Sequence, residues 1–253
     1  MWLDRVIAVR NDKLVYRDGD RCIKVFRQGY AKADVLHEAR NHAEAEAAGL
    51  PVPELLEVTQ IDGKWALVLS YVKGRTLAER MTETPQQREA CLMRLAELRQ
   101  RIHRARAPRL ERLEDKLLQR IAESGLDGDT VSRLQEAVSR EATWHPVGVC
   151  HGDLQPSNVV ECADGSHVIL DWSHAAEGNP VWDVALTTLS FLLAGDREGA
   201  MVYAATFCRE DASPLSCITA RIPAVAAARL ARCRAREREA LRAYAEGNAT
   251  ELF

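Results

Sequence analysis

The strand and helix patterns of this chain are separated along the sequence, and this separation constrains the fold most strongly. Over the first 71 residues, short β-branched runs alternate with turns, and one helical stretch lies among them. The rest of the chain is mainly helical, apart from one short β insert. Segregated strands and helices are typical of an α+β fold, in which helices gather at one face or end of an antiparallel sheet. The patterns therefore predict a small N-terminal antiparallel sheet with one helix, joined to a mainly helical part.

Five strands and one helix are expected in the N-terminal part. The turn Asp18-Gly19-Asp20 joins two of the strands, because glycine accepts a positive φ and aspartate tolerates it. The strands are predicted at residues 6–9, 13–16, 22–26, 55–61 and 65–71, and the helix at residues 31–48. This helix should bury the residues that recur at helical spacing. They are Val35, Ala39, Ala43 and Ala47.

A lobe boundary is expected near Val72–Gly74, where the strands give way to helices. It would divide the chain into an N-terminal nucleotide-binding lobe, residues 1–72, and a C-terminal catalytic and substrate-binding lobe, residues 73–253. The first helix after the boundary begins with the capping box Thr76-Leu77-Ala78-Glu79, in which two side chains satisfy exposed amides of the first turn.

Composition and charge disfavour several classes of partner. A net charge of −3 and a pI of about 6.2 give no general attraction to nucleic acid or to an anionic membrane. The apolar run near Val184–Gly195 is too short to cross a bilayer, and no signal peptide is expected at the N-terminus. The seven cysteines are odd in number, and none are spaced as C-x-x-C. A cytoplasmic protein without a disulfide framework or a zinc site is expected.

A polar motif near the β insert carries the chemistry. It reads His151-Gly152-Asp153-Leu154-Gln155-Pro156-Ser157-Asn158, and a predicted hairpin over residues 159–161 and 167–170 leads on to Asp171. Because Asp171 follows a buried strand, we expect two carboxylates and one amide to meet at a common mouth. Such oxygen ligands suit Mg²⁺. Phosphoryl transfer also needs a carboxylate that orients the attacking hydroxyl and a cation on the phosphates.

Two residues of the N-terminal part are candidates for the phosphate side of such a site. Lys24 lies in the middle of the third predicted strand and can supply the cation. Glu38 lies on the following helix and can pair with Lys24. The alternative is that both residues are solvated, Lys24 on a strand and Glu38 on a charged helix face.

With Leu170-Asp171-Trp172-Ser173 and Pro180-x-x-Asp183, this motif resembles the aminoglycoside phosphotransferase and choline kinase-like family. These are ATP-dependent small-molecule kinases with a two-lobed, protein-kinase-like fold. The resemblance covers nearly the whole chain and includes Tyr16–Lys24, Glu38 and Leu69–Gly74.

The resemblance implies a role for each candidate residue. Asp153 would be the catalytic base, and Asn158 and Asp171 would hold Mg²⁺. Lys24 would contact the α- and β-phosphates of ATP and be braced by Glu38. The backbone of Ser70 and Val72 would bind the adenine, Asp183 would anchor the catalytic loop, and His151 would support it.

One departure leaves other functions open. The loop Arg10-Asn11-Asp12 has no glycine, whereas many kinases cover the phosphates with a glycine-rich loop. Arg10 or Lys13 would then replace the backbone contacts. The alternatives are a nucleotide-binding pseudokinase or regulatory scaffold, a metal-dependent hydrolase and a protein kinase. The last is disfavoured because Gly152 stands where protein kinases usually carry arginine.

The acceptor is expected to be a small hydroxylated molecule, such as an antibiotic, an amino alcohol or a sugar-like metabolite. In this family the C-terminal helices build much of the acceptor wall. Residues 221–253 contain seven arginines and four glutamates, a net charge of +3, which disfavours a polycationic aminoglycoside and favours a neutral or zwitterionic metabolite. We interpret the arginine run from Arg229 to Arg238 as a solvated helix face, because Glu237 interrupts it. The oligomeric state stays open.

Overall fold

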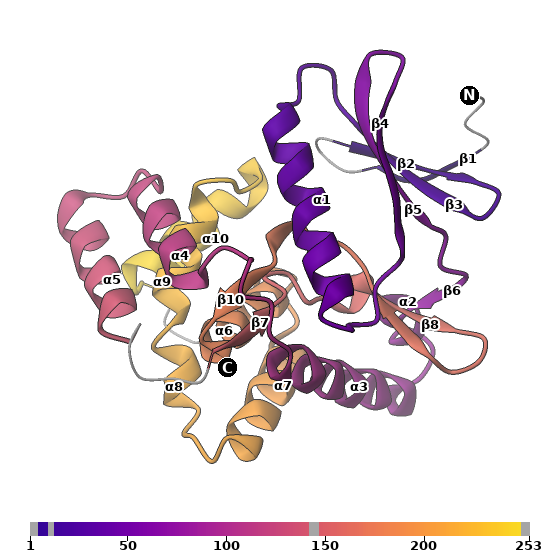
Figure 1. Cartoon of the computed structure of the whole chain (residues 1–253). Coiled ribbons are helices and arrows are strands. Elements are labelled where there is room, and N and C mark those ends of the chain that lie inside the picture. The colour runs from indigo at the N-terminus through magenta and orange to yellow at the C-terminus, as the bar shows by residue number, and fades with distance from the viewer. Residues whose placement is uncertain (1–4, 10–12, 142–146, 249–253) are drawn as a thin grey trace.

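The structure is a computed structural model that describes residues 5–9, 13–141 and 147–248. An antiparallel sheet is followed by a larger helical part (Figure 1), which confirms the predicted two-lobed α+β fold. The predicted lobe boundary at residue 72 stays a prediction. The glycine-free loop Arg10-Asn11-Asp12 and the contact proposed for Arg10 lie outside the described residues.

The N-terminal sheet has five antiparallel strands in the order β1-β2-β3-β5-β4. Its elements are β1 (Arg5–Val9), β2 (Lys13–Asp18), β3 (Arg21–Phe26), α1 (Lys32–Ala47), β4 (Leu55–Ile61) and β5 (Lys64–Ser70). Side chains alternate between the faces of a strand, so Lys24 and Phe26 lie on the same face of the central strand β3. Phe26 packs with Val35 and Ala39 of α1, and Lys24 therefore points toward this helix.

The buried face of α1 differs from the prediction. Val35 and Ala39 are buried as expected, but Ala43 and Ala47 are exposed. The other buried positions are Glu38, Asn41, His42 and Ala45. The prediction of Ala43 and Ala47 was wrong because α1 packs against the sheet on one side and against the segment after Asp171 on the other. Polar residues are buried there because each has a partner.

The helical part begins with β6 (Gly74–Thr76) and continues with the following elements. They are α2 (Leu77–Arg80), α3 (Pro85–Arg104), α4 (Leu113–Ala122), α5 (Gly128–Glu141), β7 (Gly148–Cys150), η1 (Pro156–Asn158), β8 (Val159–Cys162), β9 (His167–Ile169), η2 (Trp172–His174), β10 (Ala176–Gly178), α6 (Pro180–Leu193), α7 (Arg197–Glu210), α8 (Ser216–Thr219), α9 (Ile222–Leu230), η3 (Ala235–Glu237) and α10 (Arg238–Glu246). The capping box of Thr76 and Glu79 forms as predicted. None of the helices in the described ranges is long and apolar enough to cross a membrane.

Two small sheets position the polar motif within the helical part. Strand β7 pairs with β10, and β8 lies between β6 and β9. The motif therefore leaves β7 at Cys150, turns, and enters the β8–β9 hairpin, after which Asp171 follows. The amide of Ile169 donates to Pro51 O at 2.7 Å, which joins this hairpin to the segment between α1 and β4. Trp172 and Trp182 are buried in the core of the helical part.

Candidate active site

A buried carboxylate at the start of α6 holds the motif loop from below. Asp183 accepts the amide of Gly152 at 2.7 Å and the amide of His151 at 3.1 Å. It also lies 3.0 Å from Nε2 of His103. Burial alone would raise the pKa of Asp183, but the hydrogen bond and charge of His103 and the amide of Gly152 outweigh it, and the pKa is lowered. An ionised Asp183 thus supplies acceptors to a loop that would otherwise leave amides unpaired.

His151 joins the two halves of the motif. Its Nδ1 accepts the amide of Asp153 at 3.2 Å, so the ring proton lies on Nε2 and is donated to Leu170 O at 3.0 Å. The ring packs edge-on against Trp172, with 4.7 Å between centroids. His151 therefore fixes Asp153 relative to the residue that precedes Asp171, and no part of the ring is left to act as a base.

Asp153 is half-buried in a polar setting. Gln155 donates to its Oδ1, and Nδ2 of Asn158 donates to its Oδ2 at 3.3 Å and to its backbone oxygen at 2.9 Å. Burial raises the pKa of Asp153, while the hydrogen bond from Gln155 and the charge of Arg229 oppose this rise. A raised pKa makes the carboxylate a stronger base, which suits proton abstraction.

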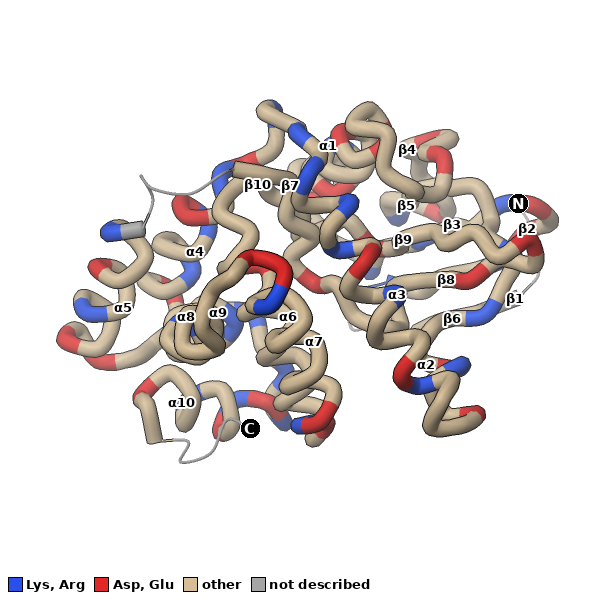
Figure 2. Tube along the Cα trace, turned by 90° about the horizontal axis from the view of Figure 1, so that it is seen from below, with Lys and Arg blue, Asp and Glu red and all other residues tan. Residues whose placement is uncertain are grey.

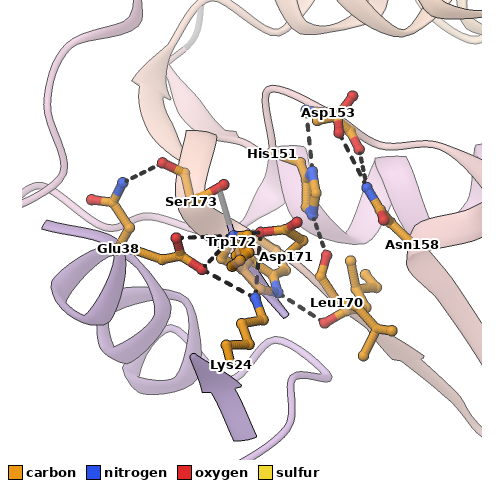
Figure 3. A network of polar contacts seen from close by, with 12 residues as sticks. Lys24, Glu38, His151, Asp153, Asn158, Leu170, Asp171, Trp172 and Ser173 are labelled. Carbon is orange, nitrogen blue, oxygen red and sulfur yellow. Dashed lines mark hydrogen bonds and ion pairs between the residues drawn. The ribbon is translucent and has the colours of Figure 1, made fainter. Parts of the chain in front are cut away.

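Lys24 reaches two carboxylates from different parts of the chain. Its Nζ lies 3.1 Å from Oε1 of Glu38 and 3.4 Å from Oδ1 of Asp171. Figure 3 shows this group on one side of His151, with Asp153 and Asn158 on the other. Lys13 makes the same two contacts, at 2.9 Å to Glu38 and 3.5 Å to Asp171. The structure thus brings together the sequence-predicted residues Lys24, Glu38 and Asp171, and Lys13 lies with them.

The charges in this group stabilise one another. Burial would lower the pKa of Lys24, but Asp171 and Glu38 raise it. Burial would likewise raise the pKa of Asp171, but Lys24 and Lys13 hold it well below its usual range. Asp171 is therefore ionised at neutral pH, although it is in a buried region. Its backbone is left-handed, with φ 60° and ψ 67°, a conformation that aspartate tolerates better than most residues.

The donor set of Asn158 and Asp171 fits Mg²⁺. Asn158 uses its Nδ2 on Asp153, so its Oδ1 remains to act as a ligand, and Asp171 is an ionised carboxylate. Within the described ranges, no group of three or more His, Cys, Asp or Glu residues is arranged to hold a metal. Two protein ligands nevertheless agree with the habit of Mg²⁺, which takes its other ligands from water and phosphate oxygens.

Ser70 and Val72 lie away from this polar group, at and beyond the end of β5. The amide of Ser70 donates to Glu54 O at 2.9 Å, and its hydroxyl accepts the amide of Glu54 at 2.9 Å. The Ser70 carbonyl and the Val72 amide are the backbone groups that the predicted adenine contact needs. That contact stays a prediction.

Sequence reasoning missed two residues of the site. His103 lies at the end of α3 and pairs with Asp183, and their separation of 80 residues leaves no local signal. Gln155 lies inside the motif, two residues after Asp153, but its type alone does not point to a contact with that carboxylate. Lys13 was one of two residues expected to replace the backbone contacts of a glycine-rich loop. It lies beside Glu38 and Asp171, and its contact with phosphates stays a prediction.

A cleft of about 730 Å³ opens beside these groups. Its lining includes Glu38, Asp153, Asn158 and Asp171, so the carboxylates and the amide predicted to meet at one mouth do so. From there the cleft extends between α1 on one side and α4 and α9 on the other.

The family of the chain is shown by a match that extends over most of its sequence, including this motif. A sequence profile described as "Phosphotransferase enzyme family" (APH) matches residues 5–216. The chain belongs to this family. No curated protein sequence matches the chain.

Solved structures of phosphotransferases share the fold. An aminoglycoside-3'-phosphotransferase of type VIII is 22% identical, with 91% of each chain covered and a TM-score of 0.64. A choline/ethanolamine kinase family protein from Mesorhizobium loti is 21% identical, with 98% of this chain and 85% of that chain covered and a TM-score of 0.60. A thermostable mutant of aminoglycoside phosphotransferase APH(4)-Ia, in a ternary complex with ADP and hygromycin B, is 16% identical, with 96% of this chain and 87% of that chain covered and a TM-score of 0.62. The phosphotransferase family and its protein-kinase-like fold were thus predicted correctly.

Proposed function

We propose that this family member is an ATP-dependent kinase that transfers the γ-phosphate to a hydroxyl of a small molecule. The observation that carries the proposal is the shared cleft of Asp153 and Asp171, two carboxylates with opposite pKa shifts. Such a pair suits one base and one ligand for a cation. Family membership and the ADP complex of a structural neighbour support the same conclusion.

In the proposed mechanism, Asp153 accepts the hydrogen bond of the acceptor hydroxyl, orients its oxygen toward the γ-phosphorus and takes its proton as the bond to phosphorus forms. Gln155 and Asn158 fix the carboxylate in the orientation that this contact needs. When bound, Mg²⁺ would be held by Asn158 and Asp171 and would neutralise charge on the phosphates.

The N-terminal part would hold ATP in register with this base. Lys24 would donate to the α- and β-phosphates, and Glu38 would keep its ammonium in place. Lys13 lies beside the same carboxylates and would add a second cation on the phosphates. The backbone of Ser70 and Val72 would accept and donate the hydrogen bonds of the adenine. We assign the activity to the cytoplasm, where the seven free thiols of the chain would stay reduced.

The test is ADP release measured with a panel of hydroxylated metabolites and antibiotics, with wild type compared with Asp153→Asn. We expect at least one acceptor to stimulate ADP release, and we expect the variant to lose about 10²- to 10⁴-fold in kcat, as is typical when a positioned base is removed. The reaction should stop in excess EDTA and return with Mg²⁺. Unchanged kcat in the variant, or full activity in EDTA, would refute the assigned roles.

A further inference from the structure

The far wall of the cleft has a charge pattern that the reaction itself does not require. Along most of the Cα trace, acidic and basic residues are interspersed (Figure 2). On this wall, formed by residues 111–123 and 228–237, the lining holds six cationic side chains and three carboxylates. The cations are Lys116, Arg120, Arg229, Arg232, Arg234 and Arg236, and the carboxylates are Glu111, Glu123 and Glu237.

Lys116 lies at the base of this wall without a carboxylate partner among the described residues. It is buried, and its Nζ donates to the backbone oxygens of His174 at 2.9 Å and of Ala175 at 3.5 Å. Burial lowers the pKa of Lys116, and together with the nearby charges of Arg120 and Arg232, against the opposing charge of Glu111, it brings this pKa to about 8. Placing this ammonium next to other cations therefore destabilises its charged form.

Arg120 and Arg232 both line this wall, Arg120 half-buried one turn beyond Lys116 on α4 and Arg232 exposed in the segment after α9. Within residues 5–9, 13–141 and 147–248, the side chains of neither arginine form a hydrogen bond or an ion pair. Burial lowers the pKa of Arg120, and Arg232 adds to this, whereas Glu111 and Glu123 act in the opposite direction without pairing with it. In the described part of the chain, the donors of these two guanidinium groups therefore have no acceptor.

Arg229 connects this cluster to the catalytic group. It donates to Oγ of Ser190 at 2.8 Å and lies 3.5 Å from Glu237. Its charge is close enough to oppose the rise in the pKa of Asp153. The cationic wall is thus continuous with the base. The arginines from Arg232 to Arg238 are exposed, so the expectation of a solvated run is confirmed, whereas the expectation of one helix was wrong. The run is not one helix, because α9 ends at Leu230 and η3 begins at Ala235, and its members from Arg229 to Arg236 turn to the cleft.

We propose that the phosphate acceptor is an anion: a hydroxylated small molecule that carries a carboxylate or a phosphate group, bound by Arg120 and Arg232 while its hydroxyl meets Asp153. The proposal rests on the proposed kinase function and narrows its acceptor. Guanidinium groups match carboxylate and phosphate oxygens with paired hydrogen bonds. A cluster of cations in a cleft also concentrates anionic ligands and repels cationic ones. The site therefore disfavours polycationic antibiotics and amino alcohols.

The test compares four hexose derivatives that share a hydroxylated frame and differ in charge. They are gluconate with a carboxylate, glucose 6-phosphate with a phosphate, neutral glucose, and glucosamine with an ammonium. Each is titrated by calorimetry against the full-length protein saturated with AMP-PNP and Mg²⁺, so that phosphate does not occupy the nucleotide site. We expect at least one of the two anions to bind about 10-fold or more tightly than glucose and glucosamine, and the better anion identifies the group.

A matched pair of variants separates the cluster from general surface charge. Arg120→Gln combined with Arg232→Gln should weaken binding of the better anion by about 10- to 150-fold, the range for charge-assisted hydrogen bonds. Arg140→Gln removes an arginine on α5 that pairs with Glu136 outside the cleft, and it should leave binding unchanged. Thermal unfolding of each variant shows whether it is folded.

The outcomes also separate this proposal from the kinase function. If all four compounds bind alike, if none binds, or if glucosamine binds best, the acceptor is not selected as an anion and the proposal is wrong. It is equally wrong if the double variant binds the anion as well as wild type does. Nucleotide binding is titrated first and on its own. Failure to bind AMP-PNP would count against the kinase function. In that case the anion titration is repeated without nucleotide, and its result still decides whether the acceptor site selects anions.

Discussion

The Oδ1 atom of Asp183 lies 2.7 Å from the amide nitrogen of Gly152. This contact ties the motif loop to α6 at a point where the backbone is left-handed, with φ +79° at Gly152. A β-carbon added there would lie 2.5 Å from His174 O. The loop is thus anchored where it cannot accept a side chain.

Replacing Gly152 with alanine should therefore disrupt the site. The substitution adds both the cost of a positive φ and a clash with the backbone of His174, so we expect a loss of more than about 2 kcal/mol in stability and a loss of most turnover. Gly165→Ala is the matched control, because Gly165 has φ +80° but open space around it. It should cost only about 1 kcal/mol. Chemical unfolding and steady-state kinetics measure both, and equal losses would show that crowding plays no part.

Asp153→Asn should lose turnover without losing stability. Burial raises the pKa of Asp153, so folding favours its protonated form. For a raised pKa, the contribution to stability is complete at low pH and is lost as the pH rises through the folded pKa. A neutral asparagine avoids that loss. The variant should therefore be at least as stable as wild type near neutral pH, and the difference should disappear in acid. A decrease of more than about 1 kcal/mol at neutral pH would contradict this account.

Gln155→Ala should move the acid limb of the pH profile. The limb of kcat/KM reports ionisation of Asp153 in the free enzyme, because the pKa of Asp171 lies well below its usual range. Gln155 donates to Asp153 and lowers its pKa. Its removal should raise that pKa and shift the limb to higher pH. Gln60→Ala, at an exposed position on β4, should leave the profile in place. A shift to lower pH would exclude Asp153 as the titrating base.

Lys24→Met should weaken the productive binding of ATP. The change removes one cation that contacts Glu38 and Asp171, and charge-assisted hydrogen bonds are worth roughly 1.5–3 kcal/mol, so kcat/KM for ATP should fall by about 10- to 150-fold. Lys13→Met should cost less, because Lys24 still holds both carboxylates. Lys64→Met, at an exposed position on β5, is the control. A larger loss for Lys13 than for Lys24 would reverse the assigned roles.

Local signals in the sequence were sufficient for much of the fold. Strand β4 has the predicted bounds 55–61, because its β-branched run is flanked by a proline and by the Asp62-Gly63 turn. The helix that begins after Thr84 has Pro85 at its start, and the Thr84 side chain accepts the amide of Gln87. The motif residues lie close together because the short β8–β9 hairpin reverses the chain and brings Asp171 back toward Asn158.

Local sequence patterns could not predict contacts between distant segments. Asn41 and His42 are polar and would be predicted to be solvated, yet Asn41 donates to Ser173 O and His42 contacts Pro53 O. His103 and Asp183 meet only because α3 and α6 pack around β7. The spacing of the arginine run correctly predicted that most of its members are solvated, but it does not show which of them border the cleft.

Helix α1 is joined to both halves of the molecule, and this has a mechanical consequence. Its Val35 and Ala39 pack on the sheet, while Asn41 donates to the backbone oxygens of Ser173 and Ala175, each at 3.3 Å. Any rotation that opens the sheet away from the helices must either break these two bonds or carry α1 along with the Asp171 segment. If α1 moves with the Asp171 segment, Glu38 stays beside Asp171 while the sheet, which carries Lys24, moves relative to α1. The distance from Lys24 to the two carboxylates then measures how far the sheet has closed onto the helical part.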